Sequence, residues 1–393
     1  MILAALLLPV ALVAVVIAIQ RFRFPAFLAL MLVITGYGFA ANMTWQSIGK
    51  AFGLGFATTL QETGLLVVAG GLVGAIALKR PLDGLGAALM GVFAGLGGSA
   101  AGALALLQPA GRAVGLALTL LTVHALVEPA PLAVAAMSVL KADFWKTLSI
   151  TAPLALVLTI AIWAWAVRRD PPGGALTWQW IVVVVPLALL VAQAIAQMPA
   201  EPLGKGGARE FYTGISKPLI LAVLAILLAM VVSWRWKPEA LADTRWASLL
   251  LTVGAAGGFA RVLDETGMAE LLAEYALDPH WGPRLGLLAP FLAAAIVKTM
   301  QGNSLSAVLT ASGMVEPMLP ALGLDSATGR ALAAAAAGIG SVAVVYFNDP
   351  LFWIAADMAK LSPARALRLI TLGSITVSIL AMAILLALKL VLP

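Results

Sequence analysis

The sequence contains no cysteine, and its only histidines are His124 and His280. The absence of cysteine excludes disulfide bonds and thiolate metal sites, and two histidines are too few for a histidine-built metal centre. The chain also has no paired-carboxylate, nucleophile or metal-ligand motif. We therefore expect neither an enzyme active site nor a bound cofactor.

Charge is scarce as well. Charged residues make up 11% of the 393 residues, whereas soluble domains carry roughly 25%. Hydrophobic residues make up 62%, and the mean hydropathy is +1.03. This composition predicts an all-α polytopic membrane protein in a lipid bilayer, because helices satisfy their own backbone hydrogen bonds in lipid. The net charge of +6 does not indicate nucleic acid as a partner, since lysine and arginine sort by membrane side in such proteins.

Long apolar runs divide the chain into about ten expected transmembrane helices. A polar loop from Asn42 to Lys50 separates the second helix from the third, and a polar linker from Pro199 to Ser216 separates the two halves of the chain. An amphipathic connection at 264–284 lies in the second half. The expected spans cover residues 1–19, 24–41, 54–78, 113–140, 147–167, 177–199, 218–234, 246–263, 331–358 and 366–391.

Two further stretches are expected to be re-entrant hairpins, which enter and leave the membrane on the same side. Residues 84–111 are rich in glycine and alanine, with the hairpin tip at Gly97, Gly98 and Ser99. A single glycine-rich span packed closely on its neighbours is the alternative for this stretch, and we favour the hairpin. The second hairpin covers residues 284–320, and its tip is the run Gln301, Gly302, Asn303 and Ser304.

Each hairpin precedes a span that we expect to be broken. Residues 113–140 contain two prolines separated by one residue, which interrupt the helical hydrogen-bond ladder, and residues 331–358 contain Pro350. Broken helices expose backbone N–H and C=O groups, which bind anions and cations respectively. The titratable and amide side chains at the two breaks are His124, Glu128, Asn348 and Asp349.

The order span, span, hairpin, broken span, span occurs twice, which predicts an internal repeat. With the N-terminus outside, basic residues collect in the inside loops, and the two hairpins open on opposite sides. That arrangement is an inverted repeat, which is typical of secondary transporters with a site where the repeats meet. The expected units are a first transmembrane helix at 1–23, a first repeat at 24–167, a connecting helix and linker at 168–217, and a second repeat at 218–393.

Polar groups at membrane depth usually mark a substrate or ion path, but each candidate also has a structural alternative. Asp349 either carries a proton or caps the half-helix that starts at Pro350, and we favour the first role. Glu128 is a proton carrier or a residue at a water-filled mouth, and His124 is a proton relay or a hydrogen-bonded core residue. Lys298 either holds an anionic substrate or extends to the membrane interface, and we favour the second.

Neutral amides at Gln301, Asn303 and Asn348 suit the hydroxyl and carboxylate groups of a bound organic acid. Their alternative role is to tie the hairpin tip to itself. We expect each hairpin tip to meet the break that follows it, with the substrate between the two halves. Glu62, inside the third span, is expected to pair with a neighbouring helix.

Four groups of residues also carry a resemblance to a known family. They are Gln301-Gly302-Asn303-Ser304, Gly338-Ile339-Gly340-Ser341, Asn348-Asp349 with Phe352-Trp353, and His124 with Val127, Pro129 and Pro131. In order and spacing they are similar to motifs of the gluconate permease family, most of all from about Gly254 to the C-terminus. The resemblance implies a proton-coupled importer of sugar acids or hydroxy acids, within a larger superfamily of ion transporters in which homodimers are usual.

Several family positions differ in this chain. The family usually has arginine where Lys298 stands, serine where Asn303 stands, and a run with more proline and a histidine where residues 128–133 stand. The resemblance therefore implies the fold and the mode of transport, but not gluconate itself. We expect an inner-membrane secondary transporter that imports a small organic acid by alternating access, with protons favoured over sodium. The alternative is a non-transporting membrane scaffold that keeps the fold.

Overall fold

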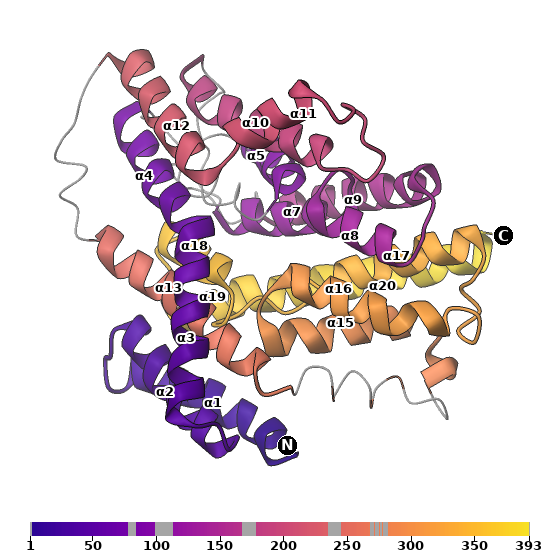
Figure 1. Cartoon of the computed structure of the whole chain (residues 1–393), viewed down its shortest axis with the longest axis horizontal. Coiled ribbons are helices and arrows are strands. Elements are labelled where there is room, and N and C mark those ends of the chain that lie inside the picture. Colours follow the sequence, from indigo (N-terminus) through magenta and orange to yellow (C-terminus); the bar gives the residue numbers. More distant parts are fainter. Residues whose placement is uncertain are drawn as a thin grey trace.

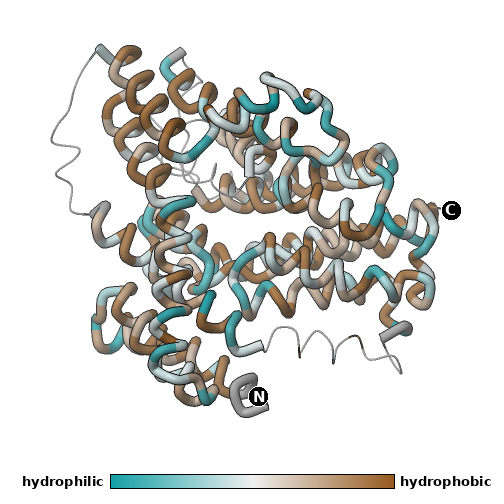
Figure 2. The backbone as a smooth tube through the Cα atoms, in the orientation of Figure 1, coloured by the Kyte–Doolittle hydropathy of each residue, from teal (hydrophilic) through white to brown (hydrophobic). Residues whose placement is uncertain are grey.

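The computed structural model describes residues 2–77, 84–98, 113–166, 178–234, 245–267, 271, 275, 277 and 282–392. These residues form helices and their connections, and they contain no strand. Figure 1 shows the helices packed side by side, with α7, α9, α17 and α20 running across the molecule. Most helices are coloured as hydrophobic in Figure 2, and the connections around α11 are hydrophilic.

The N-terminal helices differ from the prediction at one boundary. The chain begins with α1 (Ile2–Gln20) and α2 (Ala26–Ala40), followed by a continuous helix made of α3 (Trp45–Thr59), the π-helical η1 (Leu60–Gly64) and α4 (Leu65–Ala77). The predicted loop from Asn42 to Lys50 is therefore wrong beyond Thr44. The reason is a helix cap, because the Thr44 hydroxyl accepts a hydrogen bond from the Ser47 N–H at 3.2 Å.

The described helix of the first predicted hairpin packs against the first broken span. The elements are α5 (Gly84–Gly97), α7 (Ala113–Leu126), α8 (Pro131–Val139) and α9 (Phe144–Ala166). Two glycines, Gly91 and Gly95, let α5 approach α7, because a Cβ atom at either position would press on Thr119 or Val123. Residues 99–112, which would complete the predicted hairpin, lie outside the described part of the chain.

The predicted linker between the halves contains a helix. The linker follows η2 (Trp178–Trp180) and α10 (Ile181–Ala196). Its helix is α11 (Gly207–Ile215), and α12 (Pro218–Ser233) comes after it. No residue of α11 is buried, so the helix lies on the surface. Its polar sequence made the segment resemble a loop, although a surface helix needs few apolar residues.

The second half carries the second hairpin and the second broken span. The hairpin consists of α15 (Leu288–Gln301) and α16 (Ser304–Val315), which pack against each other, and the broken span consists of α17 (Ala327–Gly340) and α18 (Pro350–Met358). The remaining elements are α13 (Arg245–Asp264), η4 (Gly282–Leu285), η5 (Glu316–Met318), α19 (Pro363–Ala366), η6 (Leu367–Thr371) and α20 (Leu372–Val391).

Helices α7 and α17 form the centre of the bundle. Every residue from Leu116 to Leu126 is buried, and so is every residue from Ala331 to Gly340. The alanine-rich sequence of α17 presents small side chains, which let neighbouring helices pack close to its backbone. At Gly338 a Cβ atom would collide with the backbone carbonyl of Ala125, so the two breaks approach each other closely at this point.

Among the described residues, five helical segments are long and apolar enough to cross a membrane, or six if the bent pair α11 and α12 is one span. The chain is therefore an all-helical polytopic membrane protein, as predicted from its composition. The ten spans and the inverted repeat remain predictions. The five segments are Trp45–Ala77, Ala113–Val139, Phe144–Ala166, Ala247–Asp264 and Pro363–Val391.

Candidate functional site

The tip of the second hairpin is a tight turn between two half-helices. Helix α15 ends at Gly302, whose φ of 71° lies in the left-handed region that favours glycine. Asn303 then caps α16, and its side-chain oxygen accepts hydrogen bonds from the N–H groups of Leu305 and Ser306 at 2.9 and 3.1 Å. The side-chain oxygen of Gln301 accepts a bond from the Ser306 hydroxyl at 2.7 Å. The side chains of Gln301 and Asn303 therefore do tie the hairpin tip to itself, which is the alternative role predicted for them.

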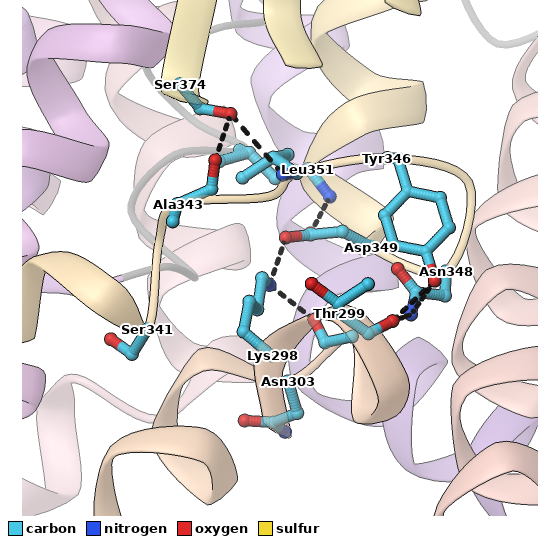
Figure 3. Close-up of polar contacts among 12 residues, drawn as sticks. Lys298, Thr299, Asn303, Ser341, Ala343, Tyr346, Asn348, Asp349, Leu351 and Ser374 are labelled. Carbon is cyan, nitrogen blue, oxygen red and sulfur yellow. Dashed lines mark hydrogen bonds and ion pairs between the residues drawn. The ribbon is translucent and has the colours of Figure 1, made fainter. Parts of the chain in front are cut away.

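The second break is a nine-residue connection from 341 to 349 that is anchored on α20 and η6. The Ser374 hydroxyl donates to the carbonyl of Ala343 at 3.0 Å (Figure 3). The Thr371 hydroxyl donates to the carbonyl of Val345 at 2.6 Å. At the end of this connection Asp349 caps α18, because its Oδ1 accepts the Leu351 N–H at 2.8 Å. The predicted capping role of Asp349 is thus seen directly.

Lys298 forms a buried ion pair with Asp349. Figure 3 shows its side chain extending from α15 toward the carboxylate, and Nζ lies 2.6 Å from Oδ2 of Asp349 and 2.5 Å from the carbonyl of Gly302. The Lys298 side chain has no exposed surface. The prediction that Lys298 extends to the membrane interface is wrong, since a buried ammonium needs a charged partner and finds one across the break.

Asn348 locks the hairpin tip onto the break. Its Nδ2 donates to the carbonyl of Thr299 at 3.1 Å, and Tyr346 donates its hydroxyl to the same carbonyl. The side chain is fully buried, and its Oδ1 has no hydrogen-bond partner within the described residues. A buried acceptor without a partner is costly, so Oδ1 is available to a ligand that donates a hydrogen bond.

The end of α5, where the sequence predicts the first hairpin tip, meets the end of α7 in a similar way. His124 is buried at the end of α7, and its Nδ1 lies 3.1 Å from the carbonyl of Gly95 on α5. Gly98 approaches the rings of His124 and Pro131. Glu128 lies in the break, is buried, and has two carboxyl oxygens that contact no hydrogen-bond partner in the part of the chain described. Ser99 lies outside the described residues.

One cavity borders the predicted hairpin tips, the second break and the half-helices on either side of the first break; we call it the site cavity. Its volume is about 620 Å³. Glu128 is not among the residues that line it, so the structure separates this carboxylate from the other candidates. The candidate residues that do line it are Gly97, Gly98, His124, Gln301, Gly302, Asn303, Ser304, Asn348 and Asp349.

The site cavity also has a polar side that sequence analysis missed. Glu62 lies in the π-helical segment η1, is exposed, and forms no ion pair within the described residues, so the prediction that it pairs with a neighbouring helix is not met. Arg261 on α13 is held by Asp264 at 2.8 Å and by Glu265 at 2.6 Å. The signal for this side was the polar spacing within apolar helices, at Thr58, Thr59, Glu62, Thr63, Gln193, Gln197 and Arg261.

The geometry suits a small polar solute. Amide, hydroxyl and charged groups from separate helices converge on one cavity inside an apolar bundle, which is the usual construction of a transporter site. The described residues contain no group of three or more histidine, aspartate or glutamate side chains that could hold a metal ion. The described chemistry is hydrogen bonding and charge pairing.

Comparison with known proteins agrees with this geometry. The family model described as GntP family permease matches residues 165–391, more than half of the chain. A gluconate permease of Pseudomonas aeruginosa is 25% identical, over 98% of this chain and 97% of that protein. A gluconate permease of Zymomonas mobilis is 23% identical, over 95% and 94% respectively. The D-serine transporter DsdX of Escherichia coli O6:H1 is 25% identical over 51% of this chain and 45% of its own length.

The resemblance predicted from the sequence motifs is therefore confirmed. The relatives are transport proteins, and the bundle described above has the apolar helices and the polar interior cavity that transport across a membrane requires. On this evidence the chain belongs to the GntP family of permeases and is a membrane transporter for small organic acids, not an enzyme.

Proposed function

We propose that the protein is a secondary active transporter that imports a small sugar acid or hydroxy acid through the site cavity by alternating access. The cavity itself carries this proposal, because its volume of about 620 Å³ lies between the half-helices of both broken spans and is lined with hydrogen-bonding groups. Sites for small molecules typically occupy roughly 300–1,000 Å³. The named relatives are transporters of gluconate and of D-serine, and both solutes are small hydroxylated carboxylates.

The substrate contacts follow from the donors and acceptors that line the cavity. We assign the substrate hydroxyls to Gln301, Asn303 and Asn348, of which Asn348 offers the unpartnered Oδ1. Free backbone N–H groups at the half-helix starts favour the substrate carboxylate, because helix N-termini attract negative charge. Ser304 is such a start, since it begins α16. The other tip residues, which we propose contact the substrate where the chain turns, are Gly97, Gly98, Ser99 and Gly302.

For the coupling ion we propose a proton carried by Asp349. Asp349 lines the site cavity and lies at the junction of the hairpin and the break. His124 also lines the cavity and is the second candidate, whereas Glu128 is buried away from the cavity lining and is the third. Sodium is the alternative ion, since carbonyl and hydroxyl oxygens also occur at the hairpin tips.

We propose the inverted repeat and ten spans as the architecture. Two contacts between the halves support it. Lys141, after the first broken span, pairs with Glu316, after the second hairpin, at 2.8 Å, and Arg330 donates to the carbonyl of Leu140 at 2.8 Å. In the proposed topology all of these residues lie at the outer side. The relatives come from bacteria, so we place the protein in the inner membrane, where the homodimer usual for the superfamily is the expected assembly.

Transport by the purified full-length protein in proteoliposomes tests the proposal. An imposed pH gradient, acidic outside, should drive uptake of labelled gluconate or D-serine above the level of protein-free vesicles. Asp349→Asn keeps the shape and the helix cap but removes the titration, so the variant should exchange substrate yet fail to accumulate it. Glu316→Gln, outside the site cavity, is the control and should accumulate normally.

Three outcomes contradict parts of this proposal. Absence of uptake of any organic acid by the wild-type protein would favour a non-transporting scaffold. Uptake that needs sodium and ignores the pH gradient would replace the proton by sodium. Full accumulation by Asp349→Asn would move the proton to His124 or Glu128.

A further inference from the structure

We propose that Lys298 is the receptor for the substrate carboxylate and that Asp349 occupies this receptor as a built-in counter-ion. A substrate carboxylate then enters by displacing Asp349 from the ammonium group. The inference rests on the proposed function, because it concerns the binding of an organic acid in the same cavity. It assigns a charge-recognition site that the amides and backbone N–H groups alone do not provide.

The first support is the geometry of the ammonium group. Lys298 lines the site cavity although its side chain has no exposed surface, and Nζ contacts the carbonyl of Gly302 at 2.5 Å and Oδ2 of Asp349 at 2.6 Å. An ammonium group has three donors. Within the described residues two of these donors have acceptors, so the third can bind a ligand oxygen while the exchange takes place.

The second support is the way in which Asp349 is held. Its Oδ1 accepts the Leu351 N–H at 2.8 Å, so α18 retains the carboxylate when Oδ2 loses its lysine. A buried ion pair is strongly destabilised when only one partner is removed. In the exchange the substrate carboxylate replaces Asp349 as the partner of the ammonium group, and the proposed coupling proton neutralises the displaced Asp349. A neutral solute offers no such replacement. The pair therefore selects for anionic substrates over neutral ones of the same size.

The third support is the state of the other cation in the cavity lining. Apart from Lys298, the described lining contains one lysine or arginine, Arg261. Two carboxylates, Asp264 and Glu265, already neutralise this guanidinium, although its Nε has no hydrogen-bond partner within the described residues, and its side chain is 41% exposed. Glu62 adds a further negative charge to the same lining. That side of the cavity is therefore unfavourable to an anion, and the ammonium of Lys298 is the favourable position.

Displacement also has a mechanical consequence. The ion pair joins the α15–α16 hairpin to α18, and the two residues are 51 positions apart in the chain. When a substrate carboxylate takes the place of Asp349, this charged link between hairpin and break is replaced by a link through the substrate. The neutral bonds from Asn348 to the hairpin stay in place.

The test measures binding to the full-length protein in lipid nanodiscs by titration calorimetry, with gluconate and its neutral analogue sorbitol as probes. Wild type should bind gluconate at least 100-fold more tightly than sorbitol. Asp349→Asn should bind gluconate at least 10-fold more tightly than wild type, because no carboxylate then competes for Lys298. Lys298→Gln should bind it at least 100-fold more weakly, and Lys298→Arg should stay within 10-fold of wild type.

Matched controls use the ion pair outside the site cavity. Lys141→Gln and Glu316→Gln remove one charge each from a pair at the ends of α8 and α16, and both should bind gluconate within twofold of wild type. If Asp349→Asn does not fold, the double variant Lys298→Gln/Asp349→Asn carries the test. This double variant contains no uncompensated charge, so it should show a cooperative thermal unfolding transition. It should bind gluconate at least 100-fold more weakly than wild type.

The outcomes separate the two proposals. Weaker gluconate binding by Asp349→Asn, wild-type binding by Lys298→Gln, or wild-type binding by the folded double variant overturns the inference and leaves the transporter intact. Equal affinity of wild type for gluconate and sorbitol also overturns it. Failure of wild type to bind or take up gluconate, D-serine or any other organic acid overturns the proposed function itself.

Discussion

Substitution of Gly302 by alanine tests how the hairpin tip is seated on the second break. The residue has a φ of 71°, which costs a non-glycine residue roughly 1–2 kcal/mol. A Cβ atom there would also collide with the backbone carbonyl of Asn348. If Asn348 moves away, its hydrogen bonds to the hairpin carbonyls weaken, at about 1 kcal/mol each. Together these effects should lower the free energy of unfolding of Gly302→Ala by about 2–4 kcal/mol.

Gly323 supplies the matched control. Its φ of 66° is nearly the same, but a Cβ atom there meets nothing within 4 Å. The free energy of unfolding of Gly323→Ala should therefore fall only by the cost of the left-handed backbone conformation, roughly 1–2 kcal/mol. Reversible unfolding of both variants in mixed detergent micelles, followed by tryptophan fluorescence, measures the difference. Equal losses for the two variants would refute the close seating of the tip, and a smaller loss for Gly302→Ala would refute the whole account.

Three further predictions concern substrate contact, topology and pH. Asn348→Ala should weaken substrate binding by roughly 1–3 kcal/mol in calorimetry, and unchanged affinity would remove Asn348 from the site. Because the chain has no cysteine, single cysteines at Leu85 and Ala321 can be labelled selectively and should react from opposite sides of the membrane; labelling of both from one side contradicts the inverted repeat. The hydrogen bond from Lys141 lowers the pKa of Glu316, so this contact stabilises the protein above the ordinary glutamate pKa, and the stabilisation is lost as pH falls through the lowered value. Arg330 also lowers this pKa, so thermal unfolding of Lys141→Gln should show a smaller acid-dependent loss than that of wild type.

The positions of the breaks could be predicted because their causes are local. A glycine that ends α15 and a proline that begins α18 act through their own backbone, and Asp349 caps the helix of its immediate neighbours. The start of α3 was missed for the same kind of reason in reverse. Thr44 is a local cap, but the polar residues after it made the segment resemble a loop.

Contacts between distant segments could not be predicted in this way. The direction of the Lys298 side chain depends on Asp349, 51 residues away, and no local pattern in the chain specifies that pairing. Sequence analysis grouped Glu128 with His124 because they are neighbours in the chain, but the fold turns only His124 into the cavity lining. The polar side of the cavity around Glu62 was also missed, since it forms only when α3, α10 and α13 come together.

The pairing of Lys298 with Asp349 restricts how this gene can change. Loss of one charge alone leaves the other buried and costs about 3–5 kcal/mol, a large share of the roughly 5–15 kcal/mol that holds a typical protein folded. The two codons are therefore expected to vary together. Lysine can exchange with arginine in one step, but neutralisation has to take both positions. A homologue in which both residues are neutral should no longer require an anionic substrate. The residues at these two positions should therefore indicate whether a homologue transports charged or neutral solutes.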